Sequence, residues 1–460
     1  MSVSGSSRRD FLRAAGTTAV VPLIGTARAW GAGRSTRVAA LKGSARSVVI
    51  PTHEFYGNLD ERLDFPADWE INVMNMRGHA APALTTGQIE ESLSKPIGTP
   101  PLREIAAGKK TVVITFDDLT RATPTYRVVP WVLFELRAAG IADEDILFMA
   151  SFATHRPMTA EEVQKKLGKE TATRYAWSNH NCFYGTKEIG TTSFGNRIQI
   201  NQTFLAADLK VTLSGIKVHY DAGYGGGAKA VLPGVAHIDT VEYNHNVILR
   251  QTKTAGPVRV FRNEMRLDMI EAARMAGVDF AVQVMYDQKL RPTHVFSGDI
   301  VDGHHAAARV AANTYCTPTL KNADIVVANA YPQNAQAFHA QRWINLSVRE
   351  GGTGVLIIQH PLTLDPIHFL NNRTASRGGA SYYQLTQKRI DARLPGNTAL
   401  VVYSQYMNRT LMNNYSRSSH FATSWEEVIR ILKERHRVDT VRVAVYPYGG
   451  MQHQEIELDG

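Results

Sequence analysis

Cysteine is nearly absent from this 460-residue chain, which contains only Cys182 and Cys316. Two thiols are too few for a disulfide framework or for a metal site built from several cysteines. They could form one disulfide, but we expect them to pack as small apolar side chains. Stability must then come from hydrophobic cores, which a chain of this length with 44% apolar residues can bury.

Concentrated positive charge is also lacking. The formal net charge is +9, and the first 29 residues contribute four arginines against one aspartate, so the remainder carries +6. No run of five or more basic residues occurs. Nucleic-acid-binding surfaces need focused basic charge. We therefore discount nucleic acid and anionic membranes as partners, while small anionic ligands remain possible.

No segment reaches the roughly 18 apolar residues that a membrane-spanning helix needs. The start of the chain, SRRDFLRAAGTTAVVPLIGTARAWG, combines a twin arginine with a short apolar stretch and the triplet Ala27-Arg28-Ala29. This pattern predicts a twin-arginine signal peptide over residues 1–29 and a periplasmic protein; a disordered basic N-terminus is the alternative. Such signals are typical of proteins exported already folded, which suggests a cofactor inserted before export.

Short β-branched runs alternate with helical patterns along the rest of the chain. TVVITF, ILFMA and LKVTLSGIKV form a first group, and ADIVVANA, GTGVLIIQ and NTALVVYSQ form a second. This alternation predicts the α/β class, with two α/β domains, mostly parallel sheets and an active-site cleft between them. We expect a cofactor-binding domain over residues 37–312, completed by residues 438–460, and a second domain over residues 313–437.

Polar motifs follow several of these strands directly: DDLTR, ATHRP, HYDAGYGGGAK and AYPQN. Ligands of open parallel sheets bind beyond the carboxyl ends of the strands. In the glycine-rich loop, Ala228 and Ala230 flank Lys229 where a phosphate-binding P-loop has glycine and serine or threonine. What remains is either a solvated loop lysine or a desolvated lysine that acts as a nucleophile or covalent tether.

Three histidines lie close to these motifs. His155 follows a predicted strand and is either an acid/base or a contact at a helix entry. His219 opens the glycine loop. His245 lies on the apolar face of a helix predicted over residues 235–249, where a core histidine is the alternative to a ligand. His219, Lys229 and His245 share one loop-and-helix unit and can converge.

Several of these motifs together resemble the nickel-pincer lactate racemase (LarA) family: DDLTRATP, ATHRPMT, Asn179-His180, HYDAGYGGGAKAVLPG, VEYNH and AYPQN, in this order. The resemblance is dense from about Asp117 to His245. It implies an isomerase, a racemase or epimerase of a 2-hydroxy acid that works by reversible hydride transfer. It also implies a nickel pyridinium-3,5-bisthiocarboxylic acid mononucleotide, which separate biosynthetic enzymes must supply.

The resemblance implies a role for each matching residue. Lys229 would carry the nucleotide covalently, and His245 would bind the nickel. His155 and His219 would be acid and base on opposite faces of the substrate. The residues Asp118, Thr120 and Arg121 would lie against cofactor and substrate.

The chain also departs from the family pattern. Ala228 stands where the family has an arginine beside the tether, and Phe338-His339 with Arg342 replace a Tyr-Gln pair and a lysine that bind substrate. Arg342 would keep a cation that can hold a carboxylate in bidentate fashion. We therefore expect a 2-hydroxy acid other than lactate. A surface histidine and a solvated helix cation are the alternatives for His339 and Arg342.

Two other function classes remain open. A periplasmic solute-binding protein for a small carboxylate would also have two α/β domains around a cleft. A zinc hydrolase using His155, His219 and His245 ranks last, because no compact zinc-ligand motif is present. The sequence assigns no role to His304, His305 or residues 371–379, and no oligomeric state.

Overall fold

The computed structural model describes residues 40–41, 46–361, 368–377, 394–407, 415, 418–438 and 440–460. The predicted signal peptide lies outside these residues, as does the end of the segment 371–379. Ala39–Gly460 form one compact unit. None of the described helices is long and apolar enough to cross a membrane. Both cysteines are buried and free, as the packing interpretation predicted.

The first large sheet has six strands. Their order is β15 (Pro292–Gly298), β14 (Phe280–Tyr286), β10 (Leu209–Gly215), β5 (Val112–Phe116), β6 (Ile146–Ala150) and β7 (Ala176–Asn179). All neighbouring strands are parallel except the edge strand β15, which is antiparallel to β14. Every residue of β5 and β14 is buried, as expected for parallel strands covered on both faces.

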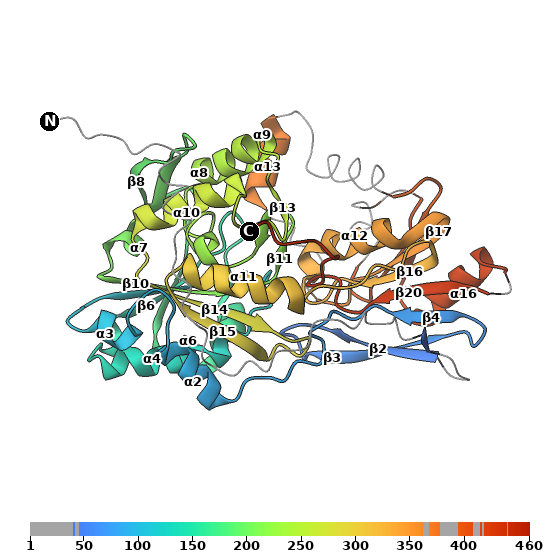
Figure 1. Cartoon of the computed structure of the whole chain (residues 1–460), viewed down its shortest axis with the longest axis horizontal. Coiled ribbons are helices and arrows are strands. Elements are labelled where there is room, and N and C mark those ends of the chain that lie inside the picture. Colours follow the sequence, from blue (N-terminus) through green and yellow to red (C-terminus); the bar gives the residue numbers. More distant parts are fainter. Residues whose placement is uncertain are drawn as a thin grey trace. The chain divides into compact units, whose positions relative to one another are not determined.

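Helices cover both faces of this sheet (Figure 1). One face packs on α2 (Thr86–Ser94), α3 (Leu102–Ala106), α4 (Val129–Ala138) and α5 (Ala160–Leu167), and the other on α7 (Gln202–Ala206), α8 (Ile238–Glu242) and α10 (Glu264–Ala276). A capping box opens α5: Thr159 accepts from the Glu162 N–H, and Glu162 accepts from the Thr159 N–H at 2.8 Å, as the spacing of these two residues in the sequence predicts. The helix ends at Gly168.

The second large sheet has seven strands. Their order is β1 (Ala40–Leu41), β4 (Glu70–Val73), β20 (Arg442–Tyr446), β16 (Ala323–Asn329), β17 (Val348–Ile357), β18 (Ala399–Tyr403) and β19 (His420–Ala422). Only β1 runs antiparallel to its neighbour. The α/β class with mostly parallel sheets is therefore confirmed.

The closing strand joins this second sheet. β20 lies between β16 and β4, so residues 442–446, a strand whose sheet the sequence left open, belong to the seven-stranded sheet. A strand buried at Val443, Ala444, Val445 and Tyr446 suits the centre of a sheet covered on both faces. The domain limits themselves stay a prediction.

The second sheet packs against α12 (Phe338–Ser347), α16 (Trp425–Arg435) and the hairpin β2 (Arg46–Thr52) and β3 (Leu59–Phe65). Trp343 of α12 stacks on Tyr446 with ring centroids 4.3 Å apart. Ser424 caps α16, as predicted. The remaining elements that matter for the site are β11 (Val218–His219), β12 (Ala222–Tyr224), β13 (Gly256–Pro257), α11 (Asp302–Thr314) and α13 (Phe369–Arg377).

Candidate active site

Three neighbouring parallel strands bring the sequence motifs together. β10, β5 and β6 are adjacent in the six-stranded sheet and run in the same direction. The loops that leave their carboxyl ends carry His219, the Asp118–Arg121 motif and His155, respectively. The predicted site residues thus share one edge of the sheet, where ligands of such sheets bind.

His155 and Asp118 form a buried pair. His155 Nδ1 lies 2.7 Å from Asp118 Oδ2, and both side chains are less than a tenth exposed. Burial alone would raise the pKa of Asp118, but the neighbouring His155 and Arg121 and the hydrogen bonds hold it well below its usual value. The carboxylate is therefore ionised and accepts the Nδ1 proton of His155. This fixes the tautomer and leaves the Nε2 lone pair available.

Thr120 and Arg121 complete this loop. Thr120 Oγ1 donates to Asp118 Oδ1 at 2.6 Å, and Arg121 Nη1 donates to Thr120 Oγ1 at 2.9 Å. Arg121 also reaches Gln336 Oε1, 3.3 Å away, in the loop after β16. The guanidinium is therefore held between the loops of the two large sheets.

A buried ion pair holds the loop that follows β5 in place. Lys166 of α5 is fully buried, and its Nζ donates to Asp117 Oδ1 at 2.7 Å. It also donates to the carbonyls of Arg121 and Thr123 at 2.8 and 3.0 Å. The second Asp117 oxygen accepts from Thr123 and from the Gly215 N–H. Asp117 and Lys166 together fix the loop from β5 to the end of β10.

His219 has a different environment. Its Nδ1 accepts from the backbone N–H groups of Asp221 and Ala222 at 3.3 and 3.1 Å. In the neutral ring the proton must then be on Nε2. Burial, and next the positive charges of Lys229 and Arg121, lower the pKa of His219 well below its usual value. The two histidines thus carry their protons on opposite ring nitrogens.

Lys229 lies on a short 3-10 helix, Gly227–Ala230. Among the described residues its Nζ has no hydrogen-bond or ion-pair partner. Burial, then Arg266 and Arg121, lower the pKa of Lys229 well below its usual value. The lowered pKa leaves more of this amine uncharged, and therefore nucleophilic, than in a solvated lysine, which favours the desolvated alternative.

The glycines before Lys229 are explained by the packing of the loop itself. Gly226 and Gly227 have positive φ angles of 72° and 59°. A Cβ on Gly226 would lie 2.7 Å from Ile216, and one on Gly227 would lie 2.7 Å from His304. His304 also approaches the Gly225 carbonyl to 3.0 Å through Nε2, so its role is to support this loop. Approach to a ligand is not needed to explain these glycines.

His245 lies in a π-helical turn, Tyr243–Ile248, that interrupts the helix predicted over residues 235–249. Such turns often occur at functional sites. Its Nδ1 donates to the Val241 carbonyl at 3.1 Å, and burial first, then Lys229, lowers its pKa to about 3. The neutral ring has its lone pair on Nε2, the arrangement of a histidine that binds a metal.

Two predicted substrate residues come from α12. His339 is 4% exposed, so the surface-residue alternative is wrong, and its Nδ1 has no hydrogen-bond partner among the described residues. Its ring stacks on Tyr220, beside His219, with centroids 4.7 Å apart. The Arg342 guanidinium lies 4.3 Å from the Tyr220 ring centroid, so Arg342 is not a freely solvated cation.

The sequence did not single out Lys217, Gln333 or Gln336. Lys217 is 3% exposed, and its Nζ donates to Gln333 Oε1. Gln333 Nε2 donates to Gln336 Oε1 at 2.6 Å, and the same oxygen accepts from Arg121. Gln333 lies in the strand-end motif AYPQN, and Gln336 follows this motif by two residues. Their position after a strand was the one signal in the sequence that could have identified them.

His368 was also missed. Its ring meets the His155 ring edge-on with centroids 4.9 Å apart, and the two residues form an isolated backbone bridge. α13, which follows it, packs on α8, and Arg373 Nη1 lies 2.6 Å from Asp239 Oδ1. The described part of residues 371–379 thus lies against the helix that leads to His245. No local pattern marks a contact between segments so distant in the chain.

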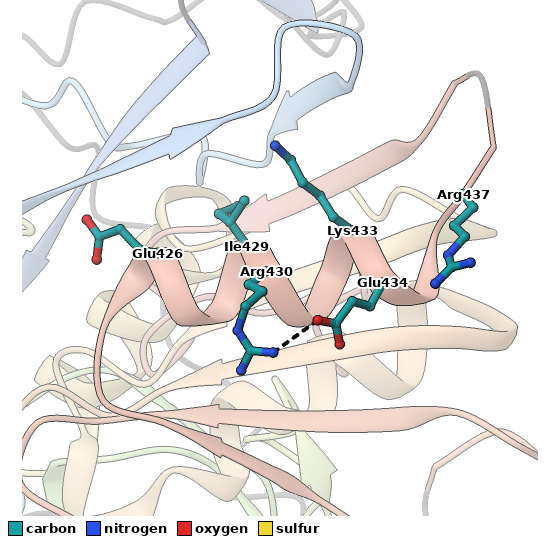
Figure 2. Close-up of a pocket in the computed structure, with 6 residues that line it drawn as sticks. All are labelled: Glu426, Ile429, Arg430, Lys433, Glu434 and Arg437. Atoms are coloured by element: carbon teal, nitrogen blue, oxygen red, sulfur yellow. Dashed lines mark hydrogen bonds and ion pairs between the residues drawn. The ribbon is translucent and has the colours of Figure 1, made fainter.

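In the described part of the chain, no group of three or more histidine, cysteine, aspartate or glutamate side chains is placed to hold a metal ion. The three-histidine zinc site is therefore not assembled by these residues. A pocket on the exposed side of α16 is lined by charged side chains, including the Arg430–Glu434 pair (Figure 2). It contains none of the residues above.

Comparisons with known proteins show what this chain is similar to. Residues 56–256 match the family described as Lactate racemase N-terminal domain. The lactate racemase of Lactiplantibacillus plantarum is 29% identical over 276 residues, and that of Thermoanaerobacterium thermosaccharolyticum is 29% identical over 278. The chain is therefore similar to lactate racemases over this part of its length. The matches cover 58% and 59% of this chain, which spans 65% and 64% of the length of these relatives.

Two solved structures share the fold. The lactate racemase apoprotein of Thermoanaerobacterium thermosaccharolyticum superposes with a TM-score of 0.65 at 22% identity, covering 88% of this chain and all of that one. A Thermotoga maritima protein superposes with a TM-score of 0.59 at 17% identity, covering 81% and 99%. The lactate racemase match over residues 56–256 includes the site residues from Asp118 to His245, whereas those on α12 lie beyond it.

Proposed function

We propose that this lactate racemase homologue is an isomerase that racemises or epimerises a 2-hydroxy acid, with His155 and His219 as the acid and base on opposite faces of the substrate. The observation that carries the proposal is their opposite tautomers. His155 directs Nδ1–H at Asp118 and has a free Nε2, whereas His219 accepts at Nδ1 and carries its proton on Nε2. A reaction that removes and returns a hydroxyl proton needs one group of each kind.

The same residues fit a nickel-pincer nucleotide joined to Lys229. The Lys229 amine is desolvated and unpartnered in the described structure, which suits a covalent tether. His245 offers a neutral imidazole nitrogen, a ligand that suits nickel. When bound, the nucleotide would supply the other nickel donors and the acceptor for the hydride from the substrate Cα. Asp118, Thr120 and Arg121 would lie against it.

The protein residues then handle the proton and the carboxylate. His155 Nε2 takes the hydroxyl proton of one enantiomer, and Asp118 stabilises the imidazolium that forms. His219 Nε2–H gives a proton to the developing alkoxide on the other face. Arg121 binds the substrate carboxylate, because its guanidinium is fixed by Thr120 and Gln336. The roles of the two histidines exchange for the opposite enantiomer.

The substrate is expected to differ from lactate. His339 and Arg342 stand where the family has a Tyr-Gln pair followed by a lysine, and both lie next to Tyr220. We also propose that the predicted signal peptide exports the folded protein to the periplasm after biosynthetic enzymes have loaded the cofactor. Both statements rest on the sequence pattern.

The test is to produce the mature chain together with the enzymes that make the nucleotide. We expect the intact mass to increase by the mass of the nucleotide, one nickel per chain by elemental analysis, and inversion of at least one 2-hydroxy acid. Lys229→Ala should lose the mass increase. Lys210→Ala is the matched control, since the side-chain amine of Lys210 donates to the Ala207 carbonyl, away from the site residues. An unmodified Lys229 without nickel would contradict the cofactor proposal, and tight binding without inversion would favour a solute-binding protein.

A further inference from the structure

Lys217 is an unusual buried lysine. It follows β10, two residues before His219, and is 3% exposed. Its Nζ donates to the Gln333 side chain and to the Gly450 carbonyl, 3.3 Å away. Among the described residues it forms no ion pair with a carboxylate. Buried charges are normally paired, because an unpaired ammonium in a protein interior is costly.

The surroundings of Lys217 are positive as well. Burial lowers the pKa of Lys217 well below its usual value, and Arg121 lowers it further. The pKa of His339 is lowered in the same direction by burial and then by Lys217, Arg121 and Arg342. No ion pair joins Arg121 or Arg342 to a carboxylate in the described part of the chain. Arg121 acts on the Asp118 carboxylate, whereas no carboxylate of the described residues is given as acting on Lys217.

Lys217 and Arg121 are within electrostatic reach of each other, and Arg121 also acts on Lys229. Lys217 is joined to Arg121 by a chain of hydrogen bonds through Gln333 and Gln336. The Nδ1 of His339, unpartnered in the described structure, belongs to the same group, because Lys217 and Arg121 both act on this ring. The neutral amides of Gln333 and Gln336 thus link Lys217 to Arg121.

We infer that the substrate is a 2-hydroxy acid with a second carboxylate, which Lys217 binds while Arg121 binds the carboxylate next to the reacting carbon. This inference rests on the proposed function and specifies its substrate class. The second carboxylate would supply the missing counterion of Lys217 and restore its charge. Gln333 and Gln336 would fix the spacing between the two anion sites.

The experiment compares two acids that differ only in the second anion. Loaded protein is given L-malate or L-malamate, in which an amide replaces the distal carboxylate, and inversion is followed by chiral chromatography. We expect kcat/KM to be about 100-fold higher for malate, the effect typical of one buried charge-assisted contact. In Lys217→Met the ratio of the two values should fall to near one. Lys210→Met, within β10 itself, should keep the wild-type ratio.

Three further results complete the test. If Lys217→Met does not fold, Lys217→Gln removes the charge while keeping a polar partner for Gln333, and the ratio should again fall. An unchanged ratio, a wild-type preference for malamate, or loss of the nucleotide mass in the Lys217 variants would overturn the inference. If loaded wild-type protein inverts neither acid, calorimetric binding of malate and malamate decides: equal affinity overturns the inference, while inversion of other 2-hydroxy acids decides the proposed function.

Discussion

Two buried lysines of this protein stand in opposite environments. Lys166 is fully buried beneath the Asp118 loop and is neutralised by Asp117 and two carbonyls. Lys217 is equally inaccessible, yet only a glutamine and a carbonyl receive its hydrogen bonds. Both side chains have their pKa lowered first by burial, but only Lys166 has carboxylates nearby that raise it again.

The difference separates structural groups from groups that await a ligand. A cation with its own carboxylate stabilises the fold and has no remaining attraction for a substrate. A buried lysine without a carboxylate partner lowers the stability of the free protein. An anion that binds to it raises that stability again. The same distinction applies to the histidines, since His155 has Asp118 and His219 has no carboxylate partner in the described structure.

The largest effect is expected at the two histidines themselves. His155→Gln and His219→Gln should each lower kcat for the preferred substrate by about 10²- to 10⁴-fold, because each removes the acid or base on one face. Steady-state inversion assays in both directions measure this effect, and intact mass confirms that the nucleotide remains attached. A variant that keeps its kcat within a few-fold of wild type would remove that histidine from the mechanism.

The next effect is on stability at Lys166. Lys166→Met should lower the free energy of unfolding by about 3–5 kcal/mol, because Asp117 becomes a buried carboxylate without its cation. Urea denaturation of the cofactor-free protein measures this change. Adding Asp117→Asn to the variant should recover part of the loss. If Lys166→Met is as stable as wild type, the pairing described above does not stabilise the loop.

A pH-dependent effect of similar size is expected at His180, a buried histidine with partners at both ring nitrogens. Its Nε2 lies 3.1 Å from the Ala236 carbonyl, and burial lowers its pKa to about 4. As the pH falls from 6.5 to 4, the unfolded chain binds a proton at His180 that the folded chain does not. The free energy of unfolding therefore decreases by up to about 3 kcal/mol over this window. Below pH 4 this contribution is constant.

Urea denaturation at several pH values tests this expectation with His180→Gln, which cannot titrate. The variant should be less stable than wild type near pH 7, because it loses optimised hydrogen bonds, but should show a shallower decline toward pH 4. Equal slopes for the two proteins would contradict the lowered pKa.

The smallest effect is expected at Lys217 in the cofactor-free protein. Lys217→Met should change the free energy of unfolding by less than about 1 kcal/mol or raise it, because an apolar side chain replaces a buried cation that has no counterion. The contrast with Lys166→Met is the direct test of the two environments. If Lys217→Met lowered the free energy of unfolding as much as Lys166→Met, Lys217 would be a structural group in the free protein.

Much of this arrangement could be predicted from the sequence. The β-branched runs identified the α/β class, and polar residues directly after the strands identified the loops with His155, His219 and the Asp118 motif. The order of strands and loops along the chain was enough to predict that these loops meet, because parallel strands bring their carboxyl ends to one edge of the sheet. The capping box of Thr159 and Glu162 was equally local and correct.

The rest depends on contacts between distant segments. The sheet that β20 joins could not be predicted, because an apolar strand fits either sheet equally well. Lys217 and His368 matter through what surrounds them, and neither burial without a counterion nor a ring contact with His155 has a sequence pattern. The glycines of the Lys229 loop suggested approach to a ligand, whereas His304 and Ile216 already fill the space beside them.

The most direct test of the central proposal follows the hydrogen on the reacting carbon. A single enantiomer of the preferred 2-hydroxy acid is racemised in D₂O by loaded protein, and the product is examined by NMR. If His155 and His219 move only the hydroxyl proton while the Cα hydrogen travels as hydride, the inverted product keeps its Cα–H. Deuterium at Cα in the inverted product would show proton abstraction from carbon and would contradict the account.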